Sequence, residues 1–204
     1  RPAINMKYSK VIFVGDSRTV GMNATLNKQM SSSVTSGVSF IASAGQGLSW
    51  FKSEGYSQLL KEINKTEGTL PIAVVFNLGV NDMANVSNYV SYMTGIASTL
   101  KSKNCKLFYM SVNPLNSTMI AKAGKGARTE AQVREFNSKI HSGLSLNYKY
   151  IDTYNVLMKT GYGTNASYVG TDRDSDDGLH YTTRTYKRIY YYSVIYLNTG
   201  SINQ

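Results

Sequence analysis

The sequence predicts an α/β fold of three layers, in which a five-stranded parallel sheet lies between two layers of helices. Five short apolar runs alternate along the chain with segments of helical spacing, the order typical of strands joined by right-handed helical crossovers. The runs 11–14 and 71–78 are rich in β-branched and aromatic residues, as in strands buried on both faces. With five strands the commoner order is 2-1-3-4-5, which places a ligand crevice at the carboxyl ends of strands 1 and 3.

The first expected strand, Val11–Val14, ends at Gly15, and a helical segment runs from there to about Met30. Asp16 and Ser17 lie at this junction. Both residue types are preferred helix N-caps, so capping alone explains them. The alternative is functional: a serine at the carboxyl edge of a strand, surrounded by free backbone N–H groups, is well placed to act as a nucleophile.

The later elements follow from spacing and turn signals. Thr129 and Gln132 form a capping-box pattern at the start of one helix. Residues 160–177 are an expected loop, and a polar, Gly-rich loop precedes residue 129. The remaining expected elements are strands 37–41, 71–78, 106–112 and 148–152, and helices 48–65 (weak, interrupted at Gly55), 85–101, 129–144 and 183–198.

Length and composition fit one globular domain over 1–204, with residues 1–7 expected to be a leader or remnant. The sequence has no run of about 20 apolar residues, as a membrane span requires. Cys105 is the one cysteine, which excludes an internal disulfide and a Cys-based zinc site. It lies at the start of an expected strand, so a buried thiol is predicted.

The formal charge of +10 predicts attraction to anionic material such as a cell-wall polymer or an acidic polysaccharide. The basic residues are scattered rather than stacked in one run, and we expect no nucleic-acid partner. A solvated surface explains even the densest groups. These are Lys122, Lys125 and Arg128 in a Gly-containing segment, and Arg184, Lys187 and Arg188 on the last expected helix.

A serine nucleophile needs a base within hydrogen-bonding reach, and a third group must hold that base. Of the two histidines, His141 falls within a predicted helix and is interpreted as structural or solvated. His180 follows Asp177 by three residues, a spacing at which a carboxylate can bind one imidazole nitrogen while the other faces the serine. This D-x-x-H pattern is common by chance.

Acyl transfer also needs donors directed at the oxyanion of the tetrahedral intermediate. The backbone N–H groups of Ser17 and Gly45 and the side-chain amide of Asn81 each follow one of the first three strands. Gly45 and Asn81 taken singly are explained by turns. Together, in this order and at one rim of the sheet, they predict an oxyanion hole.

Four blocks of the sequence, Gly15-Asp-Ser17, Gly45, Gly79-Val-Asn-Asp82 and Asp177-Gly-Leu-His180, resemble those of the SGNH (GDSL-type) hydrolase superfamily. The resemblance implies a flavodoxin-like three-layer α/β/α fold and a Ser-His-Asp mechanism without cofactor or metal. It makes Ser17 the nucleophile, His180 the base and Asp177 its orienting acid, with an oxyanion hole of Ser17, Gly45 and Asn81. Arg18 stands where the name-giving motif has Leu, and it either contacts an anionic substrate or pairs with a nearby acid.

The resemblance, the small size and the positive charge favour an esterase that removes short acyl groups, acetyl foremost, from a carbohydrate or cell-wall glycan outside a bacterial cell. Candidate substrate contacts are Asp16, Arg18 and Tyr181, and Tyr162 and Tyr168 are further candidates for stacking on sugar rings. Two alternatives stay open: an O-acetyltransferase domain acting on cell-wall sugars, and a non-catalytic module that binds an anionic polymer.

Residues Asp172–Asp176 resemble the start of a calcium loop, but the sixth position is Asp177 rather than Gly and the twelfth is Thr183 rather than Glu. We expect these acids to be solvated loop residues, with Asp177 alone bound to His180.

Overall fold

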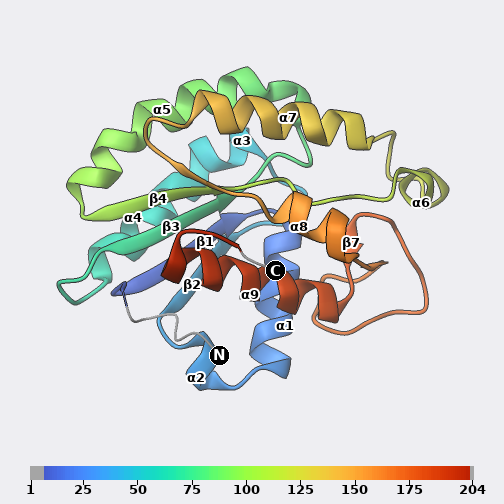
Figure 1. The fold of residues 1–204 in the computed structure, drawn as a ribbon, viewed down its shortest axis with the longest axis horizontal. Coiled ribbons are helices and arrows are strands. Elements are labelled where there is room, and N and C mark those ends of the chain that lie inside the picture. The colour runs from blue at the N-terminus through green and yellow to red at the C-terminus, as the bar shows by residue number, and fades with distance from the viewer. Residues whose placement is uncertain (1–6, 203–204) are drawn as a thin grey trace.

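Five parallel strands in the order β2-β1-β3-β4-β5 form the central sheet of the computed structural model, which describes residues 7–202 (Figure 1). This is the predicted order. The strands begin and end within two residues of the expected bounds. They are β1 (Lys10–Gly15), β2 (Val38–Ala42), β3 (Ile72–Asn77), β4 (Cys105–Met110) and β5 (Lys149–Ile151).

The register brings the first three strands to a common edge. Gly15, the last residue of β1, pairs with Ala42 of β2 on one side and with Asn77 of β3 on the other. Because all three strands are parallel and end level, the loops that follow them start side by side. The segments carrying Ser17, Gly45 and Asn81 therefore begin at the same edge of the sheet.

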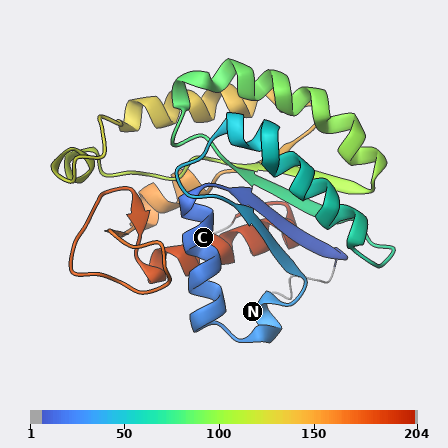
Figure 2. The same cartoon turned by 180° about the vertical axis from the view of Figure 1, so that it is seen from behind.

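Helices cover both faces of the sheet, and successive strand residues point to opposite layers. Val11 and Phe13 pack under α1 (Ser17–Gln29), α8 (Thr153–Thr160) and α9 (Thr183–Thr199), whereas Ile12 and Val14 belong to the core on the other face. Figure 2 shows this second layer from behind. It contains α4 (Tyr56–Lys65), α5 (Val86–Ser102) and α7 (Glu130–Gly143).

The expected weak helix over 48–65 is helical throughout, in three connected pieces. They are α3 (Leu48–Trp50), the π-helical segment η2 (Phe51–Gly55) and α4. Gly55 does not interrupt the helix but lets it pass close to aromatic rings. A Cβ added at this position would lie 2.8 Å from Phe51 and 3.0 Å from Trp50, so the glycine is required by packing rather than by a turn.

Several short elements lie where loops were expected. The Asp152 side chain caps α8, and the Asn116 side chain caps α6 by accepting the N–H of Met119. Their shortness hides any helical period in the sequence, so the caps alone signal them. The unpredicted elements are α2 (Ser32–Thr35), η3 (Met83–Asn85), α6 (Ser117–Lys122), α8, and the antiparallel pair β6 (Thr164–Asn165) and β7 (His180–Tyr181).

Other predictions of single features have clear outcomes. The capping box of Thr129 and Gln132 forms at the start of α7. Cys105 is buried at the start of β4, as expected, and burial raises the pKa of its thiol to about 11. No helix in residues 7–202 has the length and apolar character needed to cross a membrane. Of the expected leader 1–7, residues 1–6 lie outside the described part of the chain.

Candidate active site

Ser17 is the first residue of α1, directly after the tight turn that ends β1. Asp16 is the N-cap, and its carboxylate accepts the N–H of Arg18 at 3.0 Å. Gly15 has no room for a side chain, since a Cβ there would lie 1.9 Å from the Thr19 hydroxyl and 3.0 Å from the carbonyl oxygen of Asn77. Only Asp16 separates β1 from α1, so the serine stands at the helix N-terminus, where backbone N–H groups lack intrahelical partners.

Ser17, His180 and Asp177 form a buried hydrogen-bonded series. The Ser17 hydroxyl lies 2.8 Å from Nε2 of His180, and Nδ1 of the same ring lies 2.6 Å from Oδ2 of Asp177. The other carboxylate oxygen accepts the backbone N–H groups of Leu179 and His180, each at 2.9 Å. The serine and histidine are 163 residues apart in the sequence, so only the fold brings them together.

The Asp177 carboxylate is held in its charged form. Burial raises its pKa, but the hydrogen bonds from the His180 ring and from the backbone N–H groups of His180 and Leu179 outweigh burial, and the net pKa is about 2. An ionised carboxylate on Nδ1 fixes the ring orientation and stabilises the imidazolium that forms when Nε2 takes a proton. The arrangement therefore meets the geometric requirements of nucleophilic catalysis by serine.

Gly178 lets the segment of Asp177 and His180 pass close to α6. Its carbonyl oxygen accepts the N–H of Asn116 at 2.8 Å. A Cβ at Gly178, whose φ is +70°, would lie 2.4 Å from the Asn116 carbonyl oxygen. Position 178 in the D-G-L-H block therefore requires a glycine, because of its positive φ and its close approach to Asn116.

Arg18 is buried, and its hydrogen bonds connect the segment of Asp177 and His180 to the loop after β4. Its Nε donates to the Leu179 carbonyl at 2.8 Å, and its two terminal nitrogens donate to the carbonyls of Asn113 at 2.7 Å and Pro114 at 2.9 Å. The guanidinium also lies 4.7 Å from the centre of the Tyr181 ring, and the Tyr181 hydroxyl donates to Pro114. Both side chains hold the loops around the serine in place.

Arg18 and Tyr181 do not take the expected role of contacting substrate, because their polar groups bind backbone carbonyls inside the protein. Asp16, the third expected contact, is the N-cap of α1 and accepts the Arg18 N–H. Nearness to Ser17 and His180 in the sequence says nothing about direction, and these side chains are directed into the protein. Burial raises the pKa of Asp16 to about 6.

The loops that carry Gly45 and Asn81 are bound to each other. The Asn81 side-chain amide donates to the Gln46 carbonyl at 2.9 Å, and the Asp82 carboxylate accepts the Leu48 N–H at 2.9 Å. The other Asp82 oxygen accepts the Tyr89 hydroxyl at 2.6 Å. Since the amide nitrogen of Asn81 has two hydrogens, one remains for a ligand. Asp82 is thus a positioning residue that the sequence analysis left without a role.

Two basic side chains of the loop between α6 and α7 also reach the site, which the sequence analysis did not foresee. Arg128 donates from Nη1 to Oδ1 of Asn81 at 3.1 Å, and Nζ of Lys125 lies 3.8 Å from Oδ2 of Asp177. The Arg128 contact fixes which end of the Asn81 amide is the donor. Both residues belong to one of the two densest basic groups of the sequence. This clustering is the sequence feature that could have indicated them.

Of the three tyrosines proposed to stack on sugar, Tyr168 presents an exposed ring beside the site. Its ring centre lies 5.1 Å from that of His180, and the residue is 39% exposed. Tyr162 donates its hydroxyl to the Leu115 carbonyl and packs against the ring of Tyr181. Tyr162 therefore supports the core around the site.

The remaining candidates lie apart from the serine. His141 is exposed and stacks on Tyr150, with ring centres 4.2 Å apart. The loop acids Asp172 and Asp174 are exposed, as expected, and Asp172 also accepts the N–H of Thr183 at the start of α9. Asp176 is half-buried and accepts the N–H of Gly178. Within residues 7–202, no group of three or more His, Cys, Asp or Glu side chains is arranged to hold a metal ion.

No protein-family model and no curated protein sequence matches this chain, but solved structures do. A candidate SGNH hydrolase from Slackia heliotrinireducens aligns over 92% of this chain and 97% of its own, with a TM-score of 0.65 and 12% identity. An acetyl xylan esterase, AlAXEase, covers 93% and 99% at a TM-score of 0.63 and 14% identity.

A third similar structure is the C-terminal catalytic domain of peptidoglycan O-acetyltransferase A from Streptococcus pneumoniae. It aligns over 94% of this chain and 90% of its own, with a TM-score of 0.51 and 16% identity. At such identities the likeness establishes the fold. The chain has the α/β fold of the SGNH hydrolases, as its four sequence blocks predicted.

Proposed function

We propose that this chain, with the fold of the SGNH hydrolases, is a serine esterase that removes short acyl groups, acetyl foremost, from a carbohydrate or cell-wall glycan. The observation that carries the proposal is the series of hydrogen bonds from Ser17 Oγ through His180 to Asp177, at 2.8 and 2.6 Å. A serine hydroxyl is a weak nucleophile without such a base.

In the proposed reaction, Ser17 Oγ attacks the ester carbonyl while His180 Nε2 takes its proton. The backbone N–H groups of Ser17 and Gly45 and the amide of Asn81 stabilise the oxyanion. His180 then gives the proton to the departing alcohol oxygen. Water attacks the acyl-enzyme, again losing a proton to His180, and the acid leaves as Ser17 regains its proton.

Three observations favour a glycan as the alcohol part of the ester. Tyr168 offers an exposed aromatic ring 5.1 Å from His180, suited to packing on a sugar face. The net charge of +10 suits an acidic polymer. Two of the similar structures are named for acetyl xylan and for peptidoglycan. A cell-wall or extracellular substrate in a bacterium follows from this proposal.

The proposal is tested with 4-nitrophenyl acetate and two catalytic-site variants. Ser17→Ala and His180→Ala should each lower kcat at least 1000-fold, because either change breaks the series of hydrogen bonds. The exposed Ser87 and His141 offer matched controls, and Ser87→Ala and His141→Ala should keep the parent rate. Melting temperatures of all four variants establish that they fold. Equal rates in the parent and Ser17→Ala would remove the serine from the mechanism.

The similarity to an O-acetyltransferase domain favours a second candidate, in which a sugar hydroxyl rather than water attacks the acyl-enzyme. The two are distinguished by following 4-nitrophenol release with and without a glycan acceptor. Faster release with the acceptor, together with an acetylated glycan product, would identify a transferase. A rate independent of acceptor would identify an esterase.

A further inference from the structure

Arg128 is a half-buried cation next to the proposed oxyanion hole. It lies in the loop between α6 and α7, two residues before α7 begins, and donates from Nη1 to Oδ1 of Asn81 at 3.1 Å. A guanidinium has five N–H donors in a fixed planar fork. The Asn81 contact accounts for one of the two terminal nitrogens, so most of the fork is available to a ligand.

Within residues 7–202, Arg128 takes part in no ion pair. Partial removal from water lowers its pKa, and repulsion from Arg18 adds to this, against the attraction of Asp16 and Asp177. A partly desolvated arginine is costly unless something pairs with it. The Arg128 guanidinium is thus partly removed from water without an ion-pair partner among the described residues.

From this geometry we infer that Arg128 binds an anionic group, a carboxylate or a phosphate, on the alcohol part of the substrate. The inference rests on the proposed function, because the reaction proposed at Ser17 decides where the alcohol part of the ester, and thus its anionic group, lies. An acetyl group has no atoms to carry a negative charge, so the charge must lie on the sugar. Arginine pairs with the oxygens of carboxylates and phosphates through two parallel hydrogen bonds, which gives it specificity as well as affinity.

Lys125 adds positive charge on the same side. It is 46% exposed, and its ammonium lies 3.8 Å from Asp177. Because Lys125 already has that carboxylate as a partner, Arg128 is the residue that selects the substrate. Lys122, at the C-terminal end of α6, is exposed and takes part in no ion pair within the described chain. It offers a control that removes the same charge from the same region.

The first experiment measures binding and does not depend on turnover. Ser17→Ala is titrated by NMR with a methyl glucuronoside, with its neutral uronamide, and with glucose 6-phosphate. We expect the charged sugars to bind about tenfold more tightly than the uronamide. A preference for one charged sugar identifies carboxylate or phosphate as the natural group. The preference should disappear in Ser17→Ala/Arg128→Gln and persist in Ser17→Ala/Lys122→Gln.

The second experiment measures kcat/KM on the acetylated uronoside and acetylated uronamide. The parent should prefer the charged ester about tenfold, and Arg128→Gln should show no preference. Glutamine keeps an amide donor for Asn81 but not the charge. A residue that merely positioned Asn81 would change both rates equally and leave the ratio unaltered.

Equal binding of charged and neutral sugars, or a preference that survives Arg128→Gln, would overturn the inference. Failure of the parent to hydrolyse 4-nitrophenyl acetate would instead count against the proposed esterase, and the binding experiment would still decide the role of Arg128. Retention of the preference in Arg128→Lys would show that charge suffices without the planar fork.

Discussion

At the scale of single residues, Asn81 supplies the side-chain donor of the proposed oxyanion hole. Its carbonyl oxygen accepts from Arg128 and its nitrogen donates to Gln46, so the orientation of the amide is set from both ends. A donor held in this way needs no rearrangement when negative charge develops, which is the basis of oxyanion stabilisation.

Asn81→Ala should therefore lower kcat about 100- to 1000-fold with little change in KM, because the lost hydrogen bond forms in the transition state. Steady-state kinetics on 4-nitrophenyl acetate measure both constants. The exposed Asn88 supplies the control, and Asn88→Ala should behave as the parent. A rise in KM at constant kcat would contradict the proposed role.

Arg18 shows how a residue beside a nucleophile can be structural. Its three hydrogen bonds join α1 to the loop after β4 and to the segment containing His180. Arg18→Met would leave three buried carbonyl groups without their donor. We expect the free energy of unfolding to fall by roughly 2–4 kcal/mol, with a loss of kcat as His180 shifts.

Urea denaturation followed by circular dichroism measures that loss. Arg184 on α9 is exposed and makes no ion pair within the described residues, and Arg184→Met should change stability by less than about 0.5 kcal/mol. Arg18→Met as stable as the parent would exclude the positioning role.

At the scale of elements, Glu62 connects α4 to the strands β1 and β2. Its carboxylate accepts Lys10 of β1 at 2.9 Å and Ser39 of β2 at 2.6 Å, and it pairs with Lys65 at 2.9 Å. Burial raises the pKa of this carboxyl, but the bonds from Ser39, Lys10 and Lys65 outweigh burial and bring it to about 2.

A pKa lowered by folding means that Glu62 stabilises the protein above its ordinary pKa of 4.5 and that this contribution is lost as pH falls toward 2. Glu62→Gln should lower the free energy of unfolding by roughly 1–2 kcal/mol at pH 7 and should flatten its decline below pH 4.5. Urea denaturation at pH 7, 5 and 3 tests this. Glu67→Gln, at an exposed position, should match the parent at every pH, and parallel curves for Glu62→Gln and the parent would refute the role.

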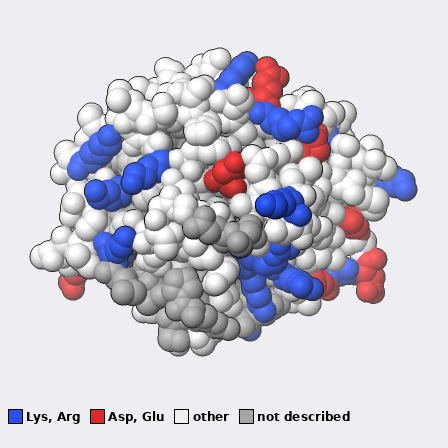
Figure 3. Space-filling view, in the orientation of Figure 1, with Lys and Arg blue, Asp and Glu red and all other residues white. Residues whose placement is uncertain are grey.

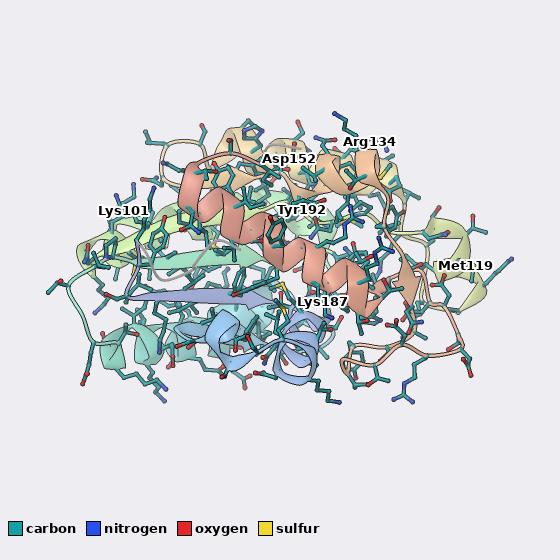
Figure 4. The ribbon with its side chains drawn as sticks, turned by 60° about the horizontal axis from the view of Figure 1, so that its bottom comes forward. Lys101, Met119, Arg134, Asp152, Lys187 and Tyr192 are labelled. Carbon is teal, nitrogen blue, oxygen red and sulfur yellow. The ribbon has the colours of Figure 1, made fainter. Side chains whose placement is uncertain are left out.

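At the scale of the whole molecule, the two ends of the sheet differ. The serine lies at the carboxyl edge, on the side of α6, where Met119 is located. Lys101 lies at the opposite end, and Lys187 and Tyr192 lie along α9 (Figure 4). Near Lys101, a cavity of about 750 Å³ is lined by Lys7, Lys101, Lys106 and Lys149. Basic side chains gather over the ends of α5 and β4 at the left of Figure 3.

Positive charge at both ends predicts that Ser17→Ala still binds an acidic polysaccharide. On a polygalacturonate matrix it should be retained at low salt and released as NaCl approaches about 0.5 M, because salt screens exposed charges. A neutral agarose matrix is the control. Retention that salt does not affect would argue against charge as the cause. Salt-sensitive retention with no ester hydrolysis by the parent would favour the polymer-binding alternative.

The sequence by itself determined the five strands, the main helices and the blocks that meet at one edge, and the commoner order of five such strands is the observed one. These follow from local signals: buried strands are continuous apolar runs, and parallel strands bring their following loops together. The predicted and observed strand bounds differ from each other by two residues or less, because the sequence pattern is weakest at the ends of strands.

Only the tertiary structure decided the directions of side chains and the partners of loops. Arg18 and Tyr181 point into the protein, while Arg128 and Lys125 reach residues 47 and 52 positions away in the sequence. The sequence does not distinguish an arginine that binds buried carbonyls, as Arg18 does, from one that donates to Asn81 and has no ion-pair partner in the described part of the chain, as Arg128 does. The difference lies in which distant backbone groups fill the surrounding space, and that is settled only when the loops pack.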